Sequence, residues 1–205
     1  MENGFETIAA SKTNEGVLEA AHRIGKVFKP DSMPLIQTLT PRTQQDAPLS
    51  TYSGNFGVGR FPFHTDMAHW HRPPRYILLF CEVPDVRVST EILHWRNVYP
   101  HINKWMHSAR FMPRRRLNNQ MFRLRIHDGE INRWDPIFIA PQNNSAVALC
   151  SFMNENDWGA GCNRVSMSKP GEMLIIDNWK ALHSRTSVPA DSHRVLRRIY
   201  LSELN

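Results

Sequence analysis

The sequence has no run of about 20 apolar residues, which a membrane-spanning helix needs. Its first residues, MENGFETIAASK, lack the basic and then apolar segments of a signal peptide. The cysteines Cys81, Cys150 and Cys162 are widely spaced and outside any C-x-x-C pair, so they indicate neither a disulfide framework nor a zinc knuckle. We therefore expect a cytoplasmic protein with no membrane partner, whose thiols are free and at least half-buried.

The length of 205 residues, with 41% hydrophobic residues, is enough to bury one sizeable core and too short for two comfortable domains. We therefore expect a single domain over residues 1–205. The formal net charge of +6 favours anionic partners. Charge alone does not distinguish a nucleic acid or a membrane surface from a small acid.

The densest basic stretch contains Arg114, Arg115 and Arg116 and is continued by Arg123 and Arg125. It lacks the regular aromatic interleaving of a base-stacking surface. We expect this stretch to be mostly solvated surface. A small-molecule partner is therefore favoured over a nucleic acid.

Short apolar runs predominate along the chain. Apolar residues at helical spacing predict a helix over residues 15–28, and a connector rich in Pro, Thr, Gln and Ser follows over 33–53, with one short strand around 35–39. A hairpin turn is predicted at Asp128-Gly129, because this dipeptide supplies the positive φ angles of tight turns. The other predicted elements are strands at 76–83, 89–95, 164–167, 172–177 and 197–204, and helices at 98–111 and 146–153. This pattern indicates a mainly β fold, a double-sheet jelly roll with helices packed on one outer side.

The segment FPFHTD carries the first sign of chemistry, at His64 and Asp66. On a strand, residues i and i+2 share a face, so one nitrogen of His64 and one oxygen of Asp66 can converge on a single ion. A third ligand must come from elsewhere. Two imidazoles and one carboxylate on one face of an octahedron leave three positions open, as non-haem iron(II) oxygenases require. Alone, H-x-D is weak evidence, since any half-exposed strand can carry it.

The downstream sequence strengthens this interpretation. The segments FPFHTDMAHW, PPRYILLFC, DNWKALHSRT and HRVLRR together resemble the taurine dioxygenase family, particularly its clavaminate-synthase-like members. The resemblance covers residues 52–201, whereas residues 1–50, the expected N-terminal helix and connector, match nothing specific. It implies a double-stranded β-helix, a cupin-like jelly roll, with iron(II) bound by His64, Asp66 and His183. It further implies 2-oxoglutarate and dioxygen as co-substrates, and hydroxylation of an aliphatic carbon with release of succinate and carbon dioxide.

The resemblance also suggests how the co-substrate and the substrate are held. Arg194 stands where the family carries its 2-oxoglutarate arginine, which contacts the far carboxylate in a bidentate manner. Thr90 stands where relatives place a hydroxyl against the same carboxylate. Arg198 is assigned to an acidic group on the substrate, with an amino acid as the first candidate. His69 and Trp70 are expected in or near the substrate pocket.

Several alternatives stay open at this point. His69 and His71 could join His64 and Asp66 in a closed zinc site, although His183 and the arginines would then have no role. The basic stretch could dock a nucleic acid or protein substrate, or the jelly roll could be a non-catalytic binding protein. The resemblance is also incomplete, since relatives carry a glycine pair before the threonine. The chain is shorter than most members, which suggests a thinner lid, a more open pocket, or a pocket completed by a second subunit in a homo-oligomer.

Overall fold

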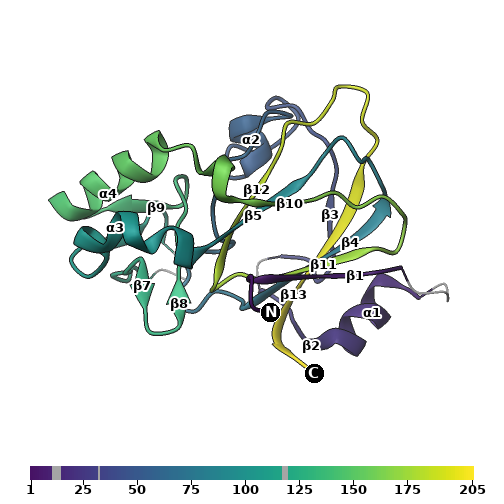
Figure 1. Cartoon of the computed structure of the whole chain (residues 1–205), viewed down its shortest axis with the longest axis horizontal. Coiled ribbons are helices and arrows are strands. Elements are labelled where there is room, and N and C mark those ends of the chain that lie inside the picture. Colours follow the sequence, from purple (N-terminus) through teal and green to yellow (C-terminus); the bar gives the residue numbers. More distant parts are fainter. Residues whose placement is uncertain (11–14, 32, 117–119) are drawn as a thin grey trace.

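The computed structural model describes residues 1–10, 15–31, 33–116 and 120–205. Two antiparallel sheets form its centre, and helices lie around them (Figure 1). The larger sheet has the order β1-β11-β4-β13-β2, and β3 also pairs with β13. Its strands are β1 (Phe5–Ile8), β2 (Gly25–Phe28), β3 (Gln37–Leu39), β4 (Tyr76–Val83), β11 (Met173–Asp177) and β13 (Val195–Leu204).

The smaller sheet has the order β10-β5-β12. Two further two-stranded sheets pair β6 with β9 and β7 with β8. These strands are β5 (Thr90–His94), β6 (Phe111–Pro113), β7 (His127–Asp128), β8 (Ile131–Asn132), β9 (Ile139–Pro141), β10 (Asn163–Val165) and β12 (Ala181–Arg185). Strand neighbours in both sheets are distant in sequence, as in a jelly roll, so the predicted mainly β fold class is confirmed.

Side chains of β4 alternate between two hydrophobic clusters. Ile77 and Leu79 face the cluster between the sheets, together with Ile92 of β5, while Leu78 faces the outer side. On that outer side, α1 covers the larger sheet through Ala20 and its neighbours. This alternation follows from the two-residue period of a strand, and it explains why the run YILLFCEV is apolar almost throughout.

The helices lie at several places around the sheets, so the prediction that they share one outer side is wrong. In Figure 1, α3 and α4 lie together on the left, while α1 lies at the lower right and α2 at the top. A third cluster, which includes Leu149 of α4 and Ile102 of α3, packs these two helices against Leu93 and Leu182 of the smaller sheet. The helical elements are α1 (Val17–Ile24), α2 (Tyr52–Phe56), α3 (Tyr99–Met106) and α4 (Asn144–Glu155), with short 3-10 helices at Trp95–Asn97 and Trp158–Gly161.

Two predicted helices end earlier than expected. The N-terminal one stops at Ile24, and residues 25–28 form β2 instead, which pairs with β13. Gly25 permits this, because a Cβ there would lie 2.1 Å from the carbonyl oxygen of Glu203. The helix predicted over 98–111 ends at Met106, and its last residue begins β6.

Most other predicted elements are present. Strand β4 has the predicted bounds, and Gly129 has a φ of 63° in the turn between β7 and β8. The three cysteines are free, with Cys81 buried and the others half-buried, as expected. No helix in the described residues is long and apolar enough to cross a membrane.

Candidate metal centre

Backbone pairing brings His64 and His183 side by side. His183 lies in the middle of β12, and each residue donates its N–H to the carbonyl of the other, at 3.0 and 2.8 Å. Asp66 follows in a turn, since Met67 has a φ of 55° in the left-handed region that non-glycine residues rarely adopt. The strand argument for the H-x-D pair was therefore wrong in its local structure, because the chain turns immediately after a single bridged residue.

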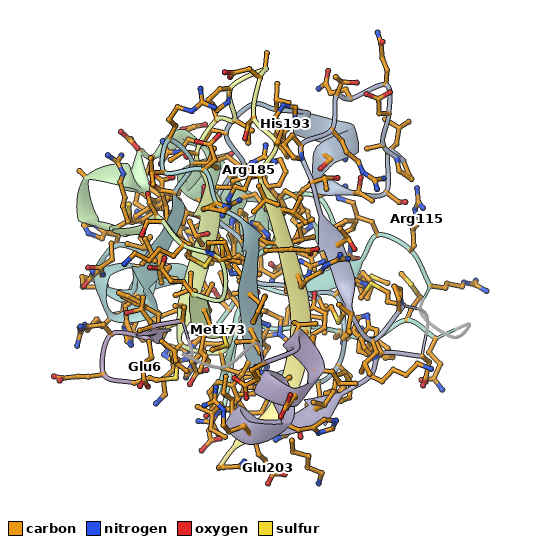
Figure 2. All side chains as sticks on the ribbon, turned by 90° about the vertical axis from the view of Figure 1, so that its right-hand side faces the viewer. Glu6, Arg115, Met173, Arg185, His193 and Glu203 are labelled. Carbon is orange, nitrogen blue, oxygen red and sulfur yellow. The ribbon has the colours of Figure 1, made fainter. Side chains whose placement is uncertain are left out.

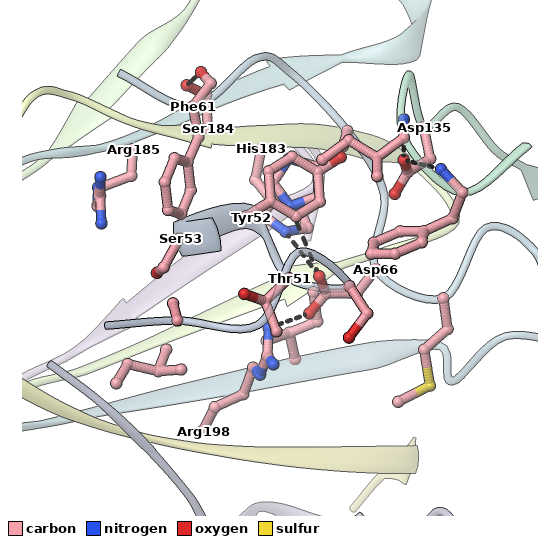
Figure 3. A pocket seen from close by; sticks show the side chains of 18 of the residues that line it. Thr51, Tyr52, Ser53, Phe61, Asp66, Asp135, His183, Ser184, Arg185 and Arg198 are labelled. Carbon is pink, nitrogen blue, oxygen red and sulfur yellow. Dashed lines mark hydrogen bonds and ion pairs between the residues drawn. The ribbon is translucent and has the colours of Figure 1, made fainter. Parts of the chain in front are cut away.

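The three side chains converge on one point. The Oδ1 of Asp66 lies 3.6 Å from Nε2 of His64 and 3.5 Å from Nε2 of His183. Neighbouring ligands of an octahedral ion with bonds of about 2.1 Å lie about 3 Å apart, so a small contraction would bring all three into place. Their donor set, two imidazoles and one carboxylate, is the facial triad of non-haem iron(II) sites. Figure 3 shows Asp66 and His183 meeting beneath the ring of Tyr52.

The residues around His64 determine which of its ring nitrogens carries the proton and lower its pKa. Its Nδ1 lies 2.9 Å from the carbonyl oxygen of Pro62, which can only accept, so Nδ1 carries the proton and Nε2 offers its lone pair. Burial lowers the pKa of His64, and the nearby His183 lowers it further. The ring of Tyr52 stacks on His64 with centroids 3.9 Å apart. His64 is therefore a neutral, oriented side chain at neutral pH, suited to hold a metal ion.

The second oxygen of Asp66 is held by two donors from β13. Nη1 of Arg198 and the hydroxyl of Tyr200 each donate to Oδ2 of Asp66 at 2.8 Å. Burial alone would raise the pKa of Asp66, but Arg198 and the two histidines lower it well below its ordinary value. The carboxylate is therefore ionised, with one oxygen fixed by the protein and the other facing the histidines.

The backbone around Asp66 is fixed by Asn178, the residue that follows β11. The Oδ1 of Asn178 accepts the N–H of Asp66 at 2.8 Å, and its Nδ2 donates to the carbonyl of Asp66 at 2.9 Å. Nδ2 also donates to the carbonyl of Pro74 at 3.0 Å. The segment DNWKALH thus supplies both the candidate ligand His183 and the amide that orients the backbone at Asp66.

The remaining predicted site residues all line one cavity of about 680 Å³, which also contains the three metal-site residues. This volume is typical of a pocket for a small ligand. The residues that the structure brings to it are Thr90 on β5, Arg194 just before β13, Arg198 on β13, and His69 and Trp70 after the ligand turn. These residues therefore lie in one pocket, and their individual roles stay predictions.

Arg194 is the clearest candidate for binding an anion. Its side chain is buried, and its Nη2 has no hydrogen-bond partner in the described part of the chain. Burial lowers the pKa of Arg194 to about 10, so the guanidinium is still charged at neutral pH. Arg185 lies nearby in the same pocket and donates to the carbonyls of Gly57 and Gly59 at 2.9 and 2.7 Å. An unpaired buried cation of this kind requires an anionic partner.

The closed zinc alternative finds no support. Among the described residues, the group whose ligand atoms converge consists of His64, Asp66 and His183. His69 lines the pocket but does not join this group. Its Nδ1 has no hydrogen-bond partner among the described residues. His71 is exposed. A four-ligand site would need both.

Sequence reasoning missed several residues around the centre: Gln37, Tyr52, Asp135, Asn178 and Tyr200. Tyr200 could have been found, because it lies two residues after Arg198 and so shares its face of β13. Gln37, whose Oε1 accepts from Arg198 Nη2 at 2.6 Å, lies in the short strand predicted around 35–39, but nothing in the sequence relates that strand to β13. Tyr52 and Asp135 lie outside long regular elements, and no spacing in the sequence relates them to the ligands.

The basic stretch lies at the margin of the pocket. Arg114 and Arg115 line its edge, and Arg115 projects outward from the molecule (Figure 2). Arg116, Arg123 and Arg125 are exposed, and residues 117–119 lie outside the described residues. Most of the stretch is thus surface, as predicted.

We expect Arg114→Gln, Arg115→Gln and Arg116→Gln combined to leave turnover of a small substrate within a few-fold of wild type, because exposed charges are screened by salt. Steady-state rates at two salt concentrations would measure this. The matched control combines Arg123→Gln and Arg125→Gln, because these two residues do not line the pocket. A loss confined to a nucleic acid substrate, with a steep salt dependence, would favour a docking surface instead.

Fold and centre together define a jelly-roll protein with a candidate mononuclear metal site. In comparisons with known proteins, the sequence matches no family model and no curated relative. Among solved structures, it is similar to asparagine oxygenase in complex with Fe(II), 2S,3S-3-hydroxyasparagine and succinate. The TM-score is 0.66 at 19% identity, over 87% of this chain and 60% of that one. The chain therefore spans about 60% of the length of that oxygenase.

Two further solved structures give similar values. The PvcB protein from Pseudomonas aeruginosa has a TM-score of 0.67 at 14% identity, over 98% of this chain and 76% of that one. The non-heme iron oxygenase OrfP in complex with Fe has a TM-score of 0.61 at 16% identity, over 88% of this chain and 61% of that one. At these identities the likeness shows the fold alone. Membership of the taurine dioxygenase family stays a prediction.

Proposed function

We propose that this chain is an iron(II)- and 2-oxoglutarate-dependent oxygenase that hydroxylates an aliphatic carbon of a small substrate bearing an acidic group, with an amino acid as the first candidate. The observation that carries the proposal is the convergence of His64, Asp66 and His183 in a pocket that also holds the unpaired guanidinium of Arg194. The names of the similar structures support it, because asparagine oxygenase and OrfP were solved with Fe and with hydroxylated amino acids.

In this proposal the three residues of the triad hold the metal and leave one side of it open to the pocket. Iron(II), bound with 2-oxoglutarate and dioxygen, supplies the oxidising chemistry that yields succinate, carbon dioxide and a hydroxylated carbon. Arg194 binds the far carboxylate of 2-oxoglutarate, and the hydroxyl of Thr90 supports it. The protein otherwise contributes geometry, since buried walls exclude water and aim one C–H bond of the substrate.

Arg198 has two assignments to reconcile. Its Nη1 donates to Asp66, and its Nε and Nη2 donate to Gln37 at 3.2 and 2.6 Å. A guanidinium has five N–H groups, so two remain for an acidic group of the substrate. We propose that Arg198 both steadies the metal carboxylate and contacts the substrate.

A succinate-release screen tests the function directly. Wild-type protein with iron(II) and 2-oxoglutarate is incubated with a panel of amino acids and small acids, and succinate and product masses are measured. We expect succinate to form in all samples at a low rate and to rise with one class of compound, whose product is heavier by one oxygen atom. Absence of iron- and 2-oxoglutarate-dependent succinate, with or without a substrate, would refute the proposal.

Tyr200→Phe tests whether the hydroxyl of Tyr200 positions the carboxylate of Asp66 for metal binding. Tyr200 is 1% exposed, and its hydroxyl is one of the two donors to Oδ2 of Asp66. Losing an outer hydrogen bond to a metal ligand typically weakens metal binding by about 10- to 100-fold. We expect a decrease of about tenfold in iron(II) affinity, measured by anaerobic titration, because Arg198 still holds the same oxygen.

Tyr99→Phe is the matched control, since the hydroxyl of Tyr99 donates to Asn132 rather than to the metal site. Its iron(II) affinity should equal that of wild type. Equal affinities for Tyr200→Phe and wild type would show that the hydroxyl does not position Asp66.

A further inference from the structure

Asp135 is a buried carboxylate that the proposed chemistry does not use. It lies between β8 and β9, is 1% exposed, and lines the pocket. The preceding residue, Trp134, is tied to the ligand loop, because its carbonyl accepts the N–H of Thr65 at 2.8 Å. This pairing places Asp135 beside the candidate metal centre, and Figure 3 shows Asp135 and Arg198 on opposite sides of Asp66.

The carboxylate of Asp135 is only partly satisfied by the protein. Its Oδ1 accepts the N–H groups of Ile137 and Phe138 at 2.7 and 2.8 Å. Within the described residues, no arginine, lysine or histidine forms an ion pair with it. The hydroxyl of Tyr52 is close enough to affect its pKa but has no completed hydrogen bond. A buried charge is normally paired, so Asp135 lacks a cation.

In the described part of the chain, the pocket residues Asp66 and Arg185 have partners within the protein, whereas Asp135 has no cation. Among the described residues, Asp66 and Asp135 are the acids that line the cavity. Asp66 is engaged by Arg198 and Tyr200, whereas Arg185 donates to backbone carbonyls. Burial raises the pKa of Asp135, the two backbone N–H groups that donate to Oδ1 limit the increase, and a cation beside the carboxylate would favour its ionised form.

We propose that Asp135 forms a cation subsite, in which its free oxygen accepts hydrogen bonds from the protonated amine of the substrate. The inference rests on the proposed function and narrows its substrate class. A charge-assisted hydrogen bond to Asp135 and a second one from Arg198 to an acid define two ends of a zwitterion. The preferred substrates are therefore amino acids rather than simple carboxylic acids.

A purely structural role for Asp135 would be to stabilise the turn at residues 136–138 through Oδ1. Asp135→Asn separates the two roles, since an asparagine oxygen can still accept from Ile137 and Phe138. The amide removes the negative charge and replaces the free oxygen with a donor, which repels an ammonium. A role in the turn alone predicts no change in ligand preference.

The experiment compares wild type and Asp135→Asn against pairs of compounds: each protein amino acid and its des-amino acid, identical except that hydrogen replaces the amine. Melting temperatures are measured on the full chain with and without Mn(II) and 2-oxoglutarate, and succinate release is measured with iron(II). We expect wild type to prefer at least one amino acid over its partner by about tenfold or more in apparent affinity, and Asp135→Asn to lose most of this preference. Asp128→Asn, in an exposed turn, should behave as wild type.

The outcomes also distinguish this inference from the proposed function. Substrate-free succinate release by wild type keeps the oxygenase assignment. The cation subsite is overturned if wild type then binds no amino acid more tightly than its des-amino partner, or if Asp135→Asn retains the preference. Absence of succinate release in wild type refutes the oxygenase, while an amine preference that depends on Asp135 in the melting curves would still support the subsite.

Discussion

His183→Ala should abolish iron-dependent succinate formation and leave the fold largely intact. His183 contributes Nε2 from the middle of β12, where its backbone pairs with Ile92 of β5 and with His64. Alanine keeps these backbone hydrogen bonds and removes one of three ligands. Changes outside the ligand set typically weaken metal binding by about 10- to 100-fold, so loss of a ligand itself should exceed about 100-fold. We expect one iron(II) per chain in wild type and no stoichiometric binding in the variant.

Iron content after anaerobic loading and circular dichroism would measure both halves of this prediction. His22→Ala, on the exposed side of α1, is the control and should retain metal and activity. His64→Ala and Asp66→Ala should also lose activity, and Asp66→Ala should be less stable as well, because Arg198 and Tyr200 would lose their acceptor. Near-wild-type turnover in His183→Ala would show that the distal ligand is wrongly assigned.

The sequence predicted the residues of this centre but not the local geometry that places them. The three residue types and the resemblance were enough to select His64, Asp66 and His183, and the structure brings them together. The local geometry was not predictable, because the left-handed conformation of Met67 and the amide of Asn178 place Asp66, rather than strand alternation. These are contacts between segments distant in sequence, which a local pattern does not encode.

The sequence was similarly limited in predicting the short strands and the helix ends of the fold. Strand β4 was predicted with its bounds because the eight-residue run YILLFCEV, apolar except for Glu82, lies between prolines. Residues 25–28 were assigned to a helix because Val27 continues the helical spacing of α1, whereas pairing with β13 decides their conformation. Strand β1 was missed, since four residues give no detectable period, yet it pairs along its length with β11. Tertiary pairing overrides local propensity in both places.

Arg194→Ala and Arg198→Ala should give defects of different kinds, although both arginines line the same pocket. Arg194 is buried and forms no ion pair with an acid among the described residues, so we assign it to the far carboxylate of 2-oxoglutarate. Removing one partner of a buried charge pair costs about 2–5 kcal/mol, which is about 30-fold to several thousand-fold in binding. Arg194→Ala should therefore raise the 2-oxoglutarate requirement by at least about 30-fold, even without substrate, and leave iron(II) affinity unchanged.

Arg198→Ala should instead act at the metal and at the substrate. Its guanidinium is one of the two donors to the outer oxygen of Asp66, so iron(II) affinity should fall, and binding of an acidic substrate should weaken. With saturating iron(II), its requirement for 2-oxoglutarate in substrate-free turnover should stay near that of wild type. Succinate formation across 2-oxoglutarate and iron(II) titrations, with and without substrate, separates these expectations.

Arg194→Lys sharpens the comparison, because it keeps a positive charge but cannot make the bidentate contact of a guanidinium. We expect it to recover part of the 2-oxoglutarate affinity that alanine loses, which a purely structural role for Arg194 would not produce. If Arg198→Ala shows the 2-oxoglutarate defect at saturating iron(II) and Arg194→Ala does not, the two roles must be exchanged.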